Sequence, residues 1–90
     1  MKKKNNTIAK LPAWFDGVIY ETGDTVVNPF TGVEFKLNGP ELSMYDFIIG
    51  LQYVMEVAPK TVTPNQIKLF HKALAWFRTN NSEAYMALLD

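Results

Sequence analysis

The chain has 90 residues, of which nine are basic, nine are acidic and 48% are hydrophobic. This length predicts a single domain, and the balanced charge excludes a strong overall field that would attract nucleic acid or an anionic membrane. The absence of cysteine excludes disulfides, zinc–thiolate sites and thiol nucleophiles. Because secreted domains of this size often depend on disulfides, we expect a cytoplasmic location.

The chain begins with a basic stretch, which we interpret as a flexible tail over residues 1–10, followed by a single α+β domain over residues 11–90. The lysines at positions 2–4 precede polar residues rather than an apolar run, so the start does not resemble a signal peptide. A short electrostatic arm is the alternative interpretation. After the tail, we expect Trp14 and Phe15 to dock on the core from an extended arm.

A small antiparallel β-meander or hairpin is predicted next. Its short strands are expected over residues 17–20, 25–28 and 33–37. Before the last strand, the sequence Asn28-Pro29-Phe30-Thr31-Gly32 is a turn signal, because proline presets φ and glycine accepts a positive φ. Phe30 would then lie at an exposed hairpin tip, and contact with a second subunit or a partner is one interpretation of it.

The most informative feature is the first predicted helix, over residues 41–57, because it is apolar on two faces. Its expected N-cap is Asn38 or Gly39. A broad apolar stripe is formed by Met44, Phe47, Ile48, Leu51, Val54 and Met55. A second stripe, nearly opposite, is formed by Leu42, Ile49 and Tyr53. A small domain has little material to bury a helix on two sides, so the second stripe must meet the chain's own hairpin, a second subunit or another protein.

A seam between the two stripes carries the small or polar residues Ser43, Asp46 and Gly50. A glycine inside a helix costs about 1 kcal/mol relative to alanine, so we expect a packing reason for Gly50. We predict that another stretch of backbone approaches the helix closely along this seam. If Asp46 is buried there, it needs a hydrogen-bonding partner.

A second helix is predicted over residues 63–79, beginning with a capping box of Thr63 and Gln66. One edge of it carries Lys68, His71 and Lys72. We interpret this edge as solvated, and the alternative is contact with an anion or with nucleic acid. No carboxylate or second histidine stands three or four positions from His71, which argues against a metal site.

A short third helix is predicted from Ser82 onwards, after Asn80 or Asn81 has ended the second helix in the left-handed conformation. The side chains expected to point inward from it are Tyr85, Met86, Leu88 and Leu89. No glycine-rich phosphate loop, nucleophile elbow or histidine pair occurs in the sequence. We therefore predict no catalytic residues, no cofactor and no bound metal.

A resemblance extends over most of the chain after residue 16. It is carried by residues 23–32 (GDTVVNPFTG), by Leu37, Glu41, Tyr45, Asp46 and Gly50, by residues 76–86 (WFRTNNSEAYM), and by Leu88, Leu89 and Asp90. In these positions the chain resembles short uncharacterised proteins encoded by tailed phages of marine cyanobacteria and similar marine bacteria. The resemblance implies a phage-encoded accessory protein in a bacterial cytoplasm, and it implies no activity or catalytic residues.

The predicted fold is α+β, with a small antiparallel meander or hairpin followed by three helices. The predicted function is that of a non-enzymatic interaction protein, a homodimer that uses an apolar face of the first helix. Its candidate interface residues are Leu42, Ile49, Tyr53 and Phe30. The alternative is a nucleic-acid-binding protein, which would use the edge formed by Lys68, His71 and Lys72 together with the N-terminal lysines.

Overall fold

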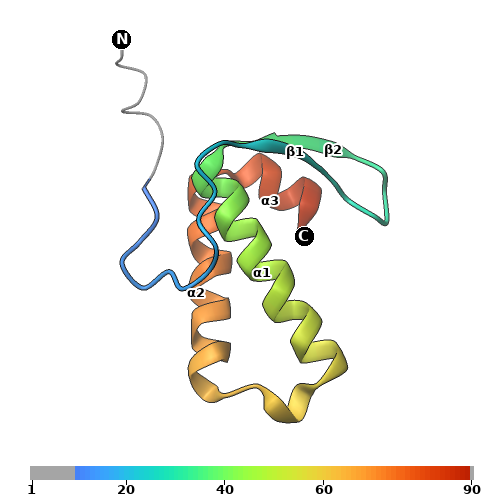
Figure 1. Cartoon of the computed structure of the whole chain (residues 1–90). Coiled ribbons are helices and arrows are strands. Elements are labelled where there is room, and N and C mark those ends of the chain that lie inside the picture. Colours follow the sequence, from blue (N-terminus) through green and yellow to red (C-terminus); the bar gives the residue numbers. More distant parts are fainter. Residues whose placement is uncertain (1–9, 90) are drawn as a thin grey trace.

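A computed structural model describes residues 10–89, so the predicted basic tail lies outside the described residues except for Lys10, which is exposed. The elements are β1 (Asp24–Val27), β2 (Glu34–Leu37), α1 (Gly39–Val57), the short 3₁₀ helix η2 (Pro59–Thr61), α2 (Pro64–Asn80) and α3 (Ser82–Leu88). α1 and α2 run antiparallel and are joined through η2, and α3 returns beneath the hairpin of β1 and β2 (Figure 1). This is the predicted α+β arrangement. Within residues 10–89, no helix has both the length and the apolar character needed to cross a membrane.

The two strands pair antiparallel, from Asp24 opposite Leu37 to Val27 opposite Glu34. The predicted turn between them is confirmed, since Gly32 has a φ of +79° and its N–H donates to the Asn28 carbonyl at 2.8 Å. The strand predicted over residues 17–20 is wrong. That segment pairs with no strand; instead it crosses the start of α1, where the Tyr20 N–H donates to the Ser43 hydroxyl at 2.8 Å.

The helix starts follow the predicted capping rules. Asn38 and Glu41 form a capping box on α1, and Thr63 and Gln66 form one on α2. The left-handed end predicted for the second helix is wrong, because no non-glycine residue among those described has a positive φ. Asn81 has a φ of −155° instead, and its side chain accepts the Ala84 N–H at 3.1 Å to cap α3.

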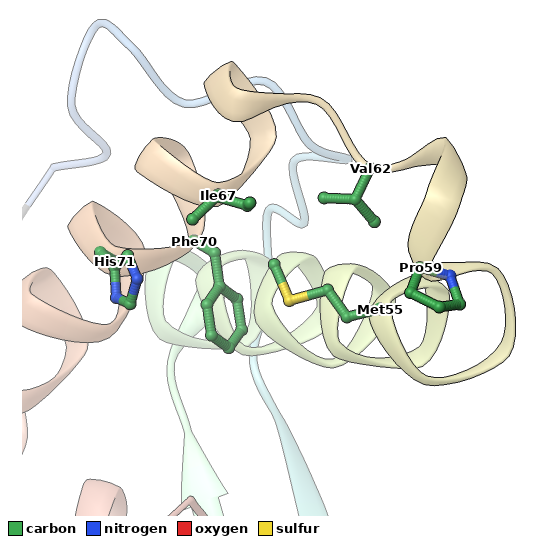
Figure 2. Close-up of a pocket in the computed structure, with 6 residues that line it drawn as sticks. All are labelled: Met55, Pro59, Val62, Ile67, Phe70 and His71. Atoms are coloured by element: carbon green, nitrogen blue, oxygen red, sulfur yellow. The ribbon is translucent and has the colours of Figure 1, made fainter.

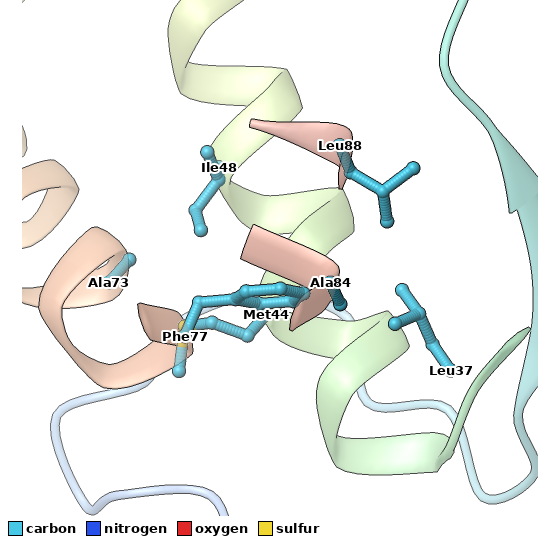
Figure 3. Packing of buried hydrophobic residues seen from close by; sticks show 7 residues of the cluster. All are labelled: Leu37, Met44, Ile48, Ala73, Phe77, Ala84 and Leu88. Atoms are coloured by element: carbon cyan, nitrogen blue, oxygen red, sulfur yellow. The ribbon is translucent and has the colours of Figure 1, made fainter. Parts of the chain in front are cut away.

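The core lies where the three helices meet the end of β2 (Figure 3). Its buried hydrophobic residues are Leu37, Met44, Ile48, Ala73, Phe77, Ala84 and Leu88. The first apolar stripe of α1 therefore faces inward as expected, with Met44 and Ile48 at its centre. On α3, Leu88 is buried as predicted, but Met86 is 66% exposed. The buried face of α3 is formed by Leu88 and by Ala84, one turn before it, and Met86 lies on the opposite face.

Two aromatic residues from the N-terminal arm cover this core, as predicted. Trp14 and Phe15 are both half-buried and pack against the cluster. The ring of Phe15 meets that of Phe47 edge-on, with 5.2 Å between centroids. The arm thus covers part of the broad stripe of α1, at Phe47.

The close backbone approach predicted along the seam of α1 occurs at its beginning and not at Gly50. Ser43 is buried, and its hydroxyl also donates to the Gly39 carbonyl at 2.8 Å. A Cβ added at Gly39 would lie 2.7 Å from the Tyr20 carbonyl oxygen, whereas one added at Gly50 would meet nothing within 4 Å. Asp46 is exposed, so it needs no buried partner.

Candidate functional site

The second apolar stripe of α1 divides into a covered part and an open part. Leu42 is half-buried and packs against the core. Ile49 is 38% exposed and Tyr53 is 63% exposed, although both belong to the same stripe. The chain's own hairpin therefore covers this stripe only incompletely, and its middle and end remain accessible.

Phe30 stands beside the open part of the stripe, at the tip of the hairpin, and is 94% exposed. Its position is set by Asn28, which is itself buried. The Asn28 Oδ1 accepts the Phe30 N–H at 2.8 Å, and the Asn28 Nδ2 donates to the Ala87 carbonyl at 2.9 Å. The first bond shapes the turn and the second ties the turn to α3, so the hairpin tip is held in place while the Phe30 ring faces solvent.

Two adjoining hollows lie between the hairpin tip and α1, and we refer to them together as the Phe30 groove. The outer hollow, of about 230 Å³, is lined by Pro29, Phe30, Ile49, Gln52, Tyr53 and Glu56. The inner hollow, of about 170 Å³, is lined by Asn28, Pro29, Phe30, Tyr45, Ile49, Gln52, Leu88 and Leu89. Three of the four predicted interface residues thus meet here, namely Phe30, Ile49 and Tyr53. Leu42 does not line the groove.

The groove is flanked by acidic rather than basic groups. α1 contains Glu41, Asp46 and Glu56 and no basic residue. Glu56 lines the outer hollow, while Glu41 is occupied by hydrogen bonds to the Asn38 N–H and the Asn81 side chain. At the inner hollow, burial raises the pKa of Tyr45, so its phenol stays protonated and uncharged at neutral pH.

The alternative site, the edge formed by Lys68, His71 and Lys72, is exposed on α2 as predicted. α2 contains Lys68, Lys72 and Arg78 and no acidic residue. The Lys72 Nζ lies 5.6 Å from the centroid of the Trp14 ring, an approach that sequence spacing did not reveal. His71 lies against Phe70 and faces a separate pocket, so the three side chains share an edge but have different neighbours.

Among residues 10–89, no three histidine, aspartate or glutamate side chains lie close enough to hold a metal ion. Every buried side-chain polar atom in the described part has a hydrogen-bonding partner. No protein-family model matches the sequence, and comparison with curated proteins and with solved structures gives no match.

Proposed function

We propose that this protein is a non-enzymatic interaction protein that forms a homodimer through the Phe30 groove, and that it acts as a phage-encoded accessory protein in a bacterial cytoplasm. The observation that carries the interaction proposal is the 94% exposed Phe30 beside an apolar hollow. Exposed apolar patches rimmed by polar residues often mark protein–protein contact sites, and here Ile49 and Tyr53 line the same hollow as Phe30. Dimerisation would bury these apolar side chains without requiring a second kind of protein.

A second copy of the chain is the occupant that the groove favours. A two-fold dimer interface places the same surface patch of each subunit against the other, so the patch must be complementary to itself. The Phe30 groove meets this requirement, because it carries a projecting ring and a hollow side by side. In the proposed dimer, Phe30 of each copy enters the outer hollow of the other and contacts Ile49 and Tyr53 there.

The expected affinity is modest. Burying one phenylalanine side chain contributes about 1.5–3 kcal/mol, and the two-fold symmetry supplies two of them. Ile49 and Tyr53 of each copy add further apolar contact. The loss of translational and rotational freedom costs about 4–15 kcal/mol, so only part of this gain remains. With that cost near its lower limit, about 4–5.5 kcal/mol would remain, which corresponds to a dissociation constant of roughly 0.1–1 mM, typical of a small and weak interface.

The acidic flank gives the dimer a distinctive salt dependence. Glu56 lines the outer hollow, so Glu56 of one copy would lie at the same interface as Glu56 of the other, where like charges repel. Added salt screens this repulsion, so dimerisation should strengthen between about 0.05 and 0.5 M salt. Association driven by opposite charges would show the reverse trend.

The proposal is tested by measuring solution mass by light scattering over a concentration series. We expect a monomer–dimer equilibrium that Phe30→Ser shifts at least tenfold toward monomer. The matched control is Val18→Ser, because Val18 is also an exposed apolar residue, at 61%, but does not line the groove. A wild-type protein that stays monomeric at millimolar concentration contradicts the proposal, and so does a dimer that is equally weakened by both variants.

Nucleic-acid binding through Lys68, His71 and Lys72 is the second candidate, and it is favoured by the absence of acidic residues from α2. Its signature is retention of DNA or RNA that weakens with salt, since phosphate contacts release counterions. The variant Lys68→Glu with Lys72→Glu should then abolish retention. Failure to retain duplex or single-stranded DNA, or RNA, at low salt would remove this candidate without affecting the dimer.

A further inference from the structure

An apolar pocket lies at the end of the helix pair that is remote from the hairpin. There α1 and α2 diverge toward the segment containing η2 (Figure 1). The pocket has a volume of about 290 Å³ and is lined by Met55, Pro59, Val62, Ile67, Phe70 and His71. These residues come from the end of α1, from the connecting segment and from the first turns of α2 (Figure 2).

The pocket is a consequence of how the two helices are joined. Near the core, the small side chain of Ala73 is fully buried and Phe77 packs beside it. Two turns before Ala73, Ile67 belongs to the apolar arc of α2 yet remains 43% exposed. Pro59 and Val62 line the part of the hollow that belongs to the connecting segment, and the apolar side chains leave this hollow open and unfilled. Its volume is near the lower limit of pockets that hold small molecules.

One lining residue provides a polar contact. His71 is the only one of the six whose side chain has a hydrogen-bonding nitrogen, and a neutral imidazole has one N–H donor. Its ring lies at one side of the set of lining residues, next to Phe70, with 5.9 Å between ring centroids (Figure 2). A ligand lying on Phe70 and Met55 would therefore meet a single donor at one end.

The charge around the pocket is positive. Residues 57–82 contain Lys60, Lys68, Lys72 and Arg78 and no acidic residue. Lys60 and Lys68 are neighbours in sequence of the lining residues Pro59 and Ile67, and both are exposed. The positive end of the α2 dipole lies at the pocket, but so does the negative end of the α1 dipole, so the positive potential comes from the lysines. Glu56 follows Met55 in sequence, but its side chain lines the Phe30 groove instead.

We propose that this pocket binds a small carboxylate with an aromatic or branched aliphatic body. The body lies between Met55, Val62 and Phe70, and the carboxylate accepts a hydrogen bond from the His71 imidazole. Lys60 and Lys68 provide the positive potential that selects the anion. None of the six lining residues belongs to the Phe30 groove, so this inference does not depend on the proposed dimer.

The probe for the test is 3-phenylpropionate, with its neutral amide for comparison, titrated into the full chain and followed by ¹H–¹⁵N NMR. We expect saturable shifts of the Ile67, Phe70 and His71 amides, with a dissociation constant of roughly 1 mM or lower. The amide should bind at least fivefold more weakly, because it lacks the charge that the imidazole and lysines favour. His71→Ala should remove most of this preference for the carboxylate.

A charge-matched pair of variants locates the site. Ile67→Glu places a negative charge in the lining of the pocket and should weaken binding of the carboxylate at least tenfold. Thr79→Glu adds the same charge to an exposed position two turns beyond His71 on α2 and should change binding less than twofold. Chemical-shift dispersion shows whether each variant is folded. If Ile67→Glu does not fold, the loss of carboxylate preference in His71→Ala is used as the test instead. Non-saturable shifts up to about 10 mM overturn the inference. Equal binding of acid and amide, or equal effects of the two variants, does so too.

Discussion

The hydrogen bond from Asn28 to α3 is expected to be the most important single polar contact for the position of the hairpin. Asn28→Ala removes the donor to the Ala87 carbonyl and the acceptor of the Phe30 N–H. A net contribution of about 1 kcal/mol for each bond, plus the cost of leaving the Ala87 carbonyl without its partner, predicts a loss of about 2–3 kcal/mol. For a domain of this size, the melting temperature should fall by roughly 8–20 °C.

Urea denaturation followed by circular dichroism measures this loss, at a concentration low enough to keep the protein monomeric. Asn28→Asp is a sharper variant, because it keeps the acceptor for the Phe30 N–H but turns a carboxylate oxygen toward the Ala87 carbonyl. It should destabilise the protein at least as much as Asn28→Ala. Thr31→Ala is the control in the same turn, since the Thr31 hydroxyl accepts only the exposed Val33 N–H. The reasoning is refuted if Asn28→Ala costs no more than Thr31→Ala.

Three other substitutions give separate tests. Gly50→Ala should raise the free energy of unfolding by about 0.5–1 kcal/mol, because the added Cβ meets nothing within 4 Å. Gly23→Ala should lower it by more than about 2 kcal/mol, since its Cβ would lie 1.8 Å from the Leu37 carbonyl oxygen. Both are measured by urea denaturation, and equal effects would contradict the backbone geometry. Burial raises the pKa of Tyr45, so the unfolded state loses that proton first and stability should fall as the pH rises above about 10. Tyr45→Phe should flatten this fall, and an unchanged slope would contradict it.

Local chemistry explains why much of the fold was predictable. The capping boxes at Asn38 and Thr63 and the turn ending at Gly32 each depend on residues within five positions of one another. Such signals can be recognised in the sequence alone, because the side chains that hydrogen-bond to the backbone lie only a few residues away from the groups they contact. The exposure of Phe30 followed from the same turn.

The errors occurred where a residue's role depends on distant parts of the chain. The β-branched residues of segment 17–20 favoured a strand. Within the described residues, however, the sheet consists of β1 and β2, and neither pairs with this segment. The Tyr20 N–H donates to the Ser43 hydroxyl instead. Gly50 had the signature of a close contact, yet the approaching backbone crosses one end of α1 only. Met86 and Ala84 could exchange inward positions because a short helix has few residues to define its buried face.

In the candidate surfaces too, some features follow from local sequence and others depend on contacts between distant parts of the chain. Helical periodicity placed Ile49 and Tyr53 on one stripe, but only the fold brings Phe30 beside them. The bond that holds Phe30 there joins residues 28 and 87, which no local pattern connects. The pocket beside His71 likewise depends on how far two helices diverge, a property that the composition of each helix does not determine.

The central claim is that Phe30 of one copy occupies the groove of another, and isotope-filtered NMR tests it most directly. A sample that mixes ¹³C-labelled and unlabelled chains reports only contacts between different molecules. We predict intermolecular NOEs from the Phe30 ring to the Ile49 methyl groups and the Tyr53 ring, which grow with protein concentration and disappear in Phe30→Ser. A dimer whose intermolecular NOEs lie elsewhere, or a concentrated sample without any, would contradict the claim.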